Sequence, residues 1–129
     1  MLTTAQKKIV RLITFSPRNT HTNGLYKSLK ILKVADIHNY LIGTFMYKYI
    51  DNKLPAIFND MFIKNSQNHN YETRTKEMFQ LPKCRTSRRQ KSIKYNGSLT
   101  WNDIAKNILI SDTLNSFKIK YKEFLIDSY

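Results

Sequence analysis

Acidic residues, cysteine and glycine are all scarce in this chain of 129 residues. Nine Asp and Glu stand against 22 Lys and Arg, which gives a formal net charge of +13. The single cysteine, Cys84, excludes an internal disulfide and a zinc site built from several cysteines. Three glycines are too few for a loop that cradles phosphates, and the three histidines show no metal-ligand spacing. The sequence therefore predicts no cofactor and no metal site.

A catalytic constellation is also missing. Polymerases and nucleases that use two metal ions need carboxylates held a few Å apart, and the nine acids here are scattered. The nearest pair on one expected helix face, Glu123 and Asp127, lies at a chain end, where helices fray. Cys84 has no recognisable base to activate it. We therefore expect that this chain alone is not an enzyme and takes no small-molecule substrate.

Long apolar runs are absent as well. The longest, residues 40–47, is interrupted by Gly43 and Thr44 and is far shorter than the roughly 20 residues that cross a bilayer. Residues 1–6 lead directly into basic residues and do not resemble a signal peptide. We expect an intracellular protein, nuclear or cytoplasmic, that is not secreted and does not bind a membrane.

The apolar pattern that is present predicts a mainly α-helical small domain. Ala5, Ile9, Leu12 and Ile13 recur at helical spacing, with Lys7, Lys8 and Arg11 on the other side, which is typical of a short amphipathic helix. The strongest helix is predicted to begin at Asp36, a good N-cap, and to run to about residue 51. Further helices are expected over residues 23–30, over residues 101–109 and after residue 112.

A short β-hairpin is expected between residues 78 and 96. Residues 78–81 and 92–95 look like two short strands, and Ile93 and Tyr95 alternate with polar residues. Asn96-Gly97 is expected to form a turn with positive φ. We thus expect a helical part over residues 1–62, and a polar connection, the hairpin and C-terminal helices over residues 63–129. The two parts are expected to form one compact unit.

A run of positive charge occupies the expected loop between these strands. It contains six cations and no acid: Lys83, Arg85, Arg88, Arg89, Lys91 and Lys94. Dense unpaired positive charge is typical of a surface that neutralises phosphates. These residues are the candidate nucleic-acid-binding site.

A second set of residues is expected to have a structural role: His69, Tyr71, Thr73, Arg74, Trp101 and Asn102. A catalytic interpretation would make His69 a base and Arg74 an anion clamp. The alternative is a buried polar cluster that pins the long connection, and it is favoured because buried polar groups must be paired. Trp101, which opens an amphipathic helix, is expected to be a core anchor.

The order and spacing of these motifs resemble the extreme C-terminal region of non-LTR retrotransposon (LINE-type, jockey-like) reverse transcriptases. The matching stretches are residues 6–14, 29–32, 45–48 and 54–55, then His69-x-Tyr71-x-Thr73-Arg74, Leu81-Pro82, Arg85-Thr86, Tyr95-x-Gly97, Trp101-Asn102 and Phe117-Lys118. The resemblance implies a thumb-like part over residues 1–62 and the tail beyond it. The implied context is RNA-directed DNA synthesis by a transposable element, although the paired aspartates of a catalytic palm are missing.

The resemblance and the charge together predict a fragment that contacts RNA or an RNA–DNA duplex through phosphates. The polymerase palm of a complete element would be its partner for catalysis. The alternative is a docking module that binds another protein and has no nucleic-acid binding of its own.

Overall fold

A computed structural model describes residues 1–68, 78–107 and 112–129. The helices are α1 (Leu2–Ile13), α2 (Thr22–Leu29), α3 (Val34–Ile50), the 3-10 turn η1 (Ala56–Phe58), α4 (Asn65–Asn68), α5 (Ser87–Gln90), α6 (Ile93–Asn107) and α7 (Leu114–Asp127). The prediction of a mainly α-helical chain is confirmed.

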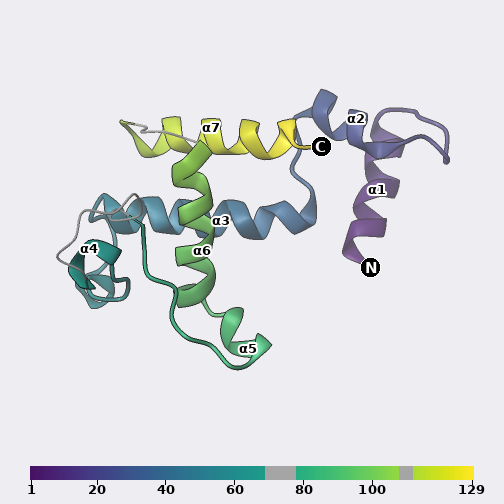
Figure 1. Cartoon of the computed structure of the whole chain (residues 1–129). Helices are drawn as coiled ribbons and strands as arrows, with labels where there is room; N and C mark the ends of the chain where they lie inside the picture. Colours follow the sequence, from purple (N-terminus) through teal and green to yellow (C-terminus); the bar gives the residue numbers. More distant parts are fainter. Residues whose placement is uncertain (69–77, 108–111) are drawn as a thin grey trace.

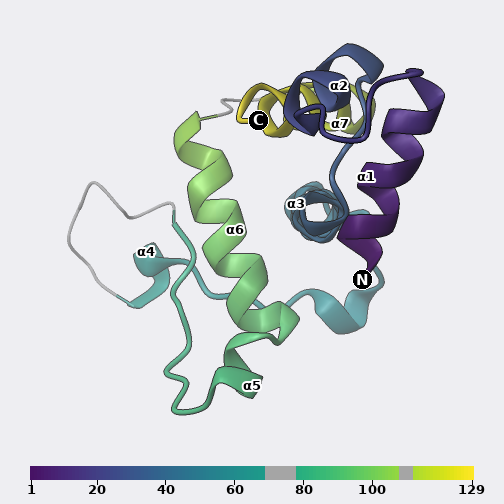
Figure 2. The same ribbon diagram turned by 90° about the vertical axis from the view of Figure 1, so that its right-hand side faces the viewer.

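Helix α3 is the centre of the fold. It contacts α1, α6 and α7. In Figure 1, α7 runs along α3 and α6 crosses it. Figure 2 looks along α3, with α6 on one side, α7 above and α1 on the other side. This arrangement explains the wide apolar arc of α3, because three helices pack around one.

Two clusters of buried side chains lie around α3. One contains Ile42, Met46, Phe62 and Phe79, and the other contains Ile104, Phe117 and Tyr121. Trp101 packs against both clusters. The α3–α7 contact is largely aromatic, with the rings of Tyr47 and Phe117 stacked at 4.7 Å between centroids.

Glycines allow the helices to approach closely. A Cβ atom at Gly43 of α3 would lie 2.5 Å from Cε1 of Tyr121 and 2.9 Å from Cδ1 of Ile104. A Cβ atom at Gly97 of α6 would lie 2.8 Å from Sδ of Met46. All three distances are well below ordinary van der Waals contact. Glycine is therefore required at both positions because the neighbouring side chains leave no room for a Cβ atom.

The predicted β-hairpin is wrong. The described part of the chain contains no strand, and its isolated antiparallel bridge joins Lys64 to Phe79. Residues 93–95 of the expected second strand and the Asn96-Gly97 turn after it belong to α6, and no described glycine has positive φ. Four alternating residues are too few to distinguish the two-residue period of a strand from the roughly 3.6-residue period of a helix. Over a longer span, Ile93, Gly97 and Trp101 follow the helical spacing of four residues.

The amphipathic helix expected near the N-terminus is present as α1, but its apolar face is exposed to solvent. Its apolar residues Ile9, Leu12 and Ile13 are exposed, and Val10 is the buried one. The inward side also presents Gln6, whose Nε2 donates to the carbonyl of Leu32 at 2.8 Å. The Oε1 of Gln6 accepts from the N–H of Val34 at 2.9 Å and from the hydroxyl of Tyr26 at 3.3 Å. Gln6 thus pairs with partly buried backbone groups at the connection between α2 and α3.

Candidate nucleic-acid interface

The basic segment lies around α5, at an end of the molecule remote from α2 and α7 (Figure 1). All six candidate side chains, from Lys83 to Lys94, are exposed. Helix α5 contacts the start of α6, so Arg88 and Arg89 of α5 are held near Lys91 and Lys94. The structure therefore brings these cations together on one protrusion.

The short helix α5 is fixed by its N-cap. The side-chain oxygen of Thr86 accepts a hydrogen bond from the N–H of Arg89 at 3.3 Å. The N–H of Gln90 donates to the carbonyl of Thr86, and the N–H of Ser92 donates to the carbonyl of Arg89. These local bonds turn the chain directly into α6. The arginines therefore project from an ordered turn, where we expected a hairpin loop.

The segment before the basic run is anchored by an amide clamp. Phe79, which is 3% exposed, donates its N–H to Oδ1 of Asn102 and accepts at its carbonyl from Nδ2 of Asn102, both at 3.0 Å. On the other side of this segment, the N–H of Gln80 donates to the carbonyl of Ile63. The side chain of Asn102 thus pairs with Phe79 as a neighbouring strand would. The sequence pattern indicates a structural role for Asn102 but not its partner Phe79, because the two residues lie 23 positions apart and no local pattern relates them.

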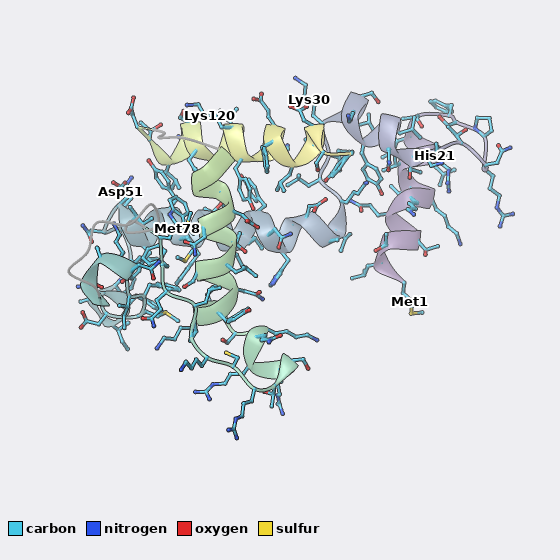
Figure 3. All side chains as sticks on the ribbon, in the orientation of Figure 1. Met1, His21, Lys30, Asp51, Met78 and Lys120 are labelled. Carbon is cyan, nitrogen blue, oxygen red and sulfur yellow. The ribbon has the colours of Figure 1, made fainter. Side chains whose placement is uncertain are left out.

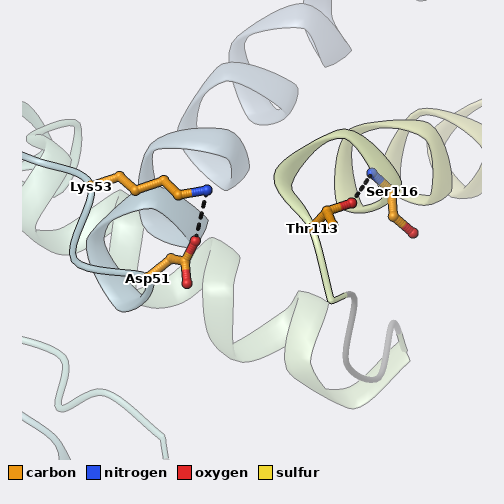
Figure 4. Close-up of polar contacts among 4 residues, drawn as sticks. All are labelled: Asp51, Lys53, Thr113 and Ser116. Carbon is orange, nitrogen blue, oxygen red and sulfur yellow. Dashed lines mark hydrogen bonds and ion pairs between the residues drawn. The ribbon is translucent and has the colours of Figure 1, made fainter.

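The positive charge of the segment is not neutralised within the described residues. The ion pair that the described residues do form joins Asp51 to Lys53 at 2.9 Å (Figure 4). It lies at the C-terminal end of α3, outside the basic segment. No described carboxylate pairs with any of the six cations. Neither α5 nor α6 has an acid in its first turn.

Helix dipoles add to this charge. The N-terminal end of a helix is partially positive, so cations there are unfavourable. Lys91 lies just before α6 and Lys94 lies in its first turn. The free protein thus carries mutual repulsion at this end of α6, and a bound polyanion would relieve it.

The other predicted residues fall into two groups. His69, Tyr71, Thr73 and Arg74 lie outside the described residues. Trp101 is half-buried between the two clusters, with its ring 5.7 Å from that of Phe117.

Among the described residues, no three His, Cys, Asp or Glu side chains could share a metal ion. No helix within the described ranges is long and apolar enough to cross a membrane. The chain matches no protein-family model, no curated protein and no solved structure. The basic segment therefore remains the strongest candidate site.

Proposed function

We propose that this chain is a nucleic-acid-contacting accessory region of an RNA-directed DNA polymerase from a retrotransposon, without the catalytic palm. The observation that carries the proposal is the cluster of six exposed cations between Lys83 and Lys94, none of them paired with a described carboxylate. The resemblance of the ordered motifs to non-LTR reverse transcriptases supports the same assignment.

The mechanism is neutralisation of phosphates. Lysine and arginine side chains release counterions from a nucleic-acid backbone, and such contacts position the backbone without reading its sequence. Arg85, Arg88 and Arg89 offer planar donors that can bind a phosphate through two hydrogen bonds each. We therefore expect binding to RNA or an RNA–DNA duplex that depends strongly on salt and little on sequence.

The test replaces Arg85, Arg88 and Arg89 together with Ala. Fluorescence anisotropy of labelled RNA and of an RNA–DNA duplex is followed over a salt series. Each lost contact should make the log–log salt slope shallower by about 0.7 for single strands and about 0.9 for duplex. The triple variant should therefore differ from the parent by roughly two to three units of slope for unrelated sequences.

A matched control removes the same net charge from another surface. Lys118, Lys120 and Lys122 lie on α7, and Figure 3 shows Lys120 at the opposite side of the molecule from α5. Their replacement by Ala should leave the salt slope nearly unchanged. If both triple variants lose affinity equally, net charge alone governs binding, and the basic segment is not the interface.

A parent chain that binds neither nucleic acid at low salt would contradict the proposal altogether. The docking module without nucleic-acid binding would then replace it. The exposed apolar residues of α1 are the observation that favours this alternative.

A further inference from the structure

Helix α1 exposes a line of apolar side chains that the rest of the described protein leaves uncovered. Leu2, Ala5, Ile9 and Leu12 follow one another at intervals of three and four residues, and we call this line the apolar seam. Leu2 is 72% exposed, Ile9 is 54% exposed and Leu12 is 74% exposed. This spacing is that of the a and d positions of a heptad, which present a narrow stripe to one other helix.

An aromatic side chain lies just beyond the seam. Phe15 is 97% exposed and has a φ of 52°, in the left-handed region. The N–H of Phe15 donates to the carbonyl of Leu12, and the N–H of Ser16 donates to that of Arg11. This is the helix ending that ordinarily places glycine where Phe15 stands. The protein thus holds a large apolar ring in solvent at a conformational cost.

A cationic groove adjoins the same end of the seam. It has a volume of about 420 Å³ and is lined by Lys8, Arg11, Leu12, Ser16 and Arg18. Leu12 belongs to both the seam and the groove. Nε of Arg11 donates to the carbonyl of Thr20 at 3.1 Å, which holds this side chain in place. The first acidic residue in the sequence is Asp36, so no carboxylate of residues 1–35 can neutralise the groove.

We propose that the apolar seam and the cationic groove bind an amphipathic helix of a partner protein whose flank carries acidic residues. The apolar side chains of that helix would cover the seam, and one or more carboxylates would enter the groove. A narrow a/d stripe with charges beside it is the pattern by which one helix recognises another. This interface is separate from the basic segment around α5 and does not depend on it.

Charge and shape argue against the other occupants. A second copy would bring Lys7, Lys8 and Arg11 against the same cations, because α1 contains no acid. A flat anionic membrane would cover an apolar stripe but would leave a concave groove unfilled. A nucleic acid would supply charge to the groove but nothing apolar for the seam.

The experiment uses the full chain and two synthetic labelled peptides of three heptads each, both with Leu at a and d. One peptide has Glu at e and g, where repulsion between copies keeps it monomeric, and the other has Lys there. Fluorescence anisotropy should show binding of the Glu peptide and at least tenfold weaker binding of the Lys peptide. Equal binding of the two peptides would overturn the charge assignment and the proposal with it.

Two variants locate the interface. Ile9→Ser with Leu12→Ser should weaken binding of the Glu peptide at least tenfold, with an unchanged circular dichroism spectrum because both side chains are exposed. Ile57→Ser is the matched control, since Ile57 is 85% exposed and lies outside α1. Lys8→Glu with Arg18→Glu should reverse the preference from the Glu peptide to the Lys peptide. Unchanged affinity in the seam variant would overturn the proposal.

The competing occupants are tested with the same protein. Binding to vesicles containing phosphatidylserine, without binding to the Glu peptide, would assign the seam to a membrane. Dimerisation in sedimentation velocity that Ile9→Ser with Leu12→Ser abolishes would assign it to a second copy. Either result overturns the proposal. The triple arginine variant of the basic segment should still bind the Glu peptide, so failure of the proposed function and failure of this inference are distinguishable.

Discussion

Replacement of Gly43 by Ala should destabilise the protein, although the same change favours an isolated helix. Gly43 lies in the middle of α3, where alanine is preferred to glycine by about 1 kcal/mol. The added methyl group, however, would lie 2.5 Å and 3.0 Å from two ring carbons of Tyr121 and 2.9 Å from Cδ1 of Ile104. The outcome therefore depends on whether these neighbours can move.

Tyr121 has little freedom to move. It is 3% exposed, its ring stacks against those of Phe117 and Tyr40, and its hydroxyl donates to the carbonyl of Asn39 at 3.3 Å. Forcing an extra methyl group into such a core costs about 1–3 kcal/mol. With rigid neighbours the cost should fall at the upper end, which leaves a net loss of about 2 kcal/mol after the helix preference is subtracted.

Gly24 provides the control for this prediction. It lies in α2, and a Cβ atom there would meet nothing within 4 Å. Gly24→Ala should therefore raise the free energy of unfolding by about 0.5–1 kcal/mol. Urea unfolding of the two variants and the parent, followed by far-ultraviolet circular dichroism, measures both effects at once. If Gly43→Ala stabilises the protein as much as Gly24→Ala does, the close packing of α3 against α6 and α7 is wrong.

Three further perturbations test the helix ending, the amide clamp and the aromatic core. Phe15→Gly should raise the free energy of unfolding by about 0.5–1 kcal/mol, because glycine adopts the left-handed backbone conformation of this position without strain. A lower free energy of unfolding in urea would contradict this. Asn102→Ala should lower it by about 2 kcal/mol, since two buried backbone groups of Phe79 lose their partner; an unchanged midpoint would refute the clamp. Burial raises the pKa of Tyr121 from 10.0 to about 12, so its contribution to stability is complete below pH 10 and is lost as the pH rises towards 12. Tyr121→Phe should make stability fall less steeply over that interval in thermal melts.

Local patterns predicted the helices that pack on one clear face. In the helix expected after residue 112, apolar residues recur at helical spacing; of these, Phe117 and Tyr121 are buried in α7, whereas Phe124 is exposed. The start of α3 was predicted within two residues, but the N-cap is Lys33, and Asp36, expected to be the cap, lies in the first turn. These features depend on neighbours three or four positions apart, and such information is present in a single sequence.

Features that depend on distant partners could not be read in this way. Gly97 appeared to be a turn residue because Asn-Gly favours turns, but the structure uses it for close approach to Met46 of another helix. The clamp between Asn102 and Phe79 joins residues far apart in the sequence. In both cases the role of the residue depends on a partner that is distant in the sequence, and only the packing of α6 against its neighbours shows that role.

Helix α1 shows the limit of periodicity most directly. Its pattern correctly predicts an amphipathic helix, but periodicity alone does not say which molecule covers the apolar face. Within the protein, the side-chain amide of Gln6 donates to the carbonyl of Leu32 and accepts from the N–H of Val34. These bonds hold the side of α1 that carries Gln6 and Val10 inward, and Ile9 and Leu12 are exposed to solvent. The same orientation therefore satisfies the fold and presents the apolar seam to a partner, and this is why variants in the seam should change binding while leaving stability intact.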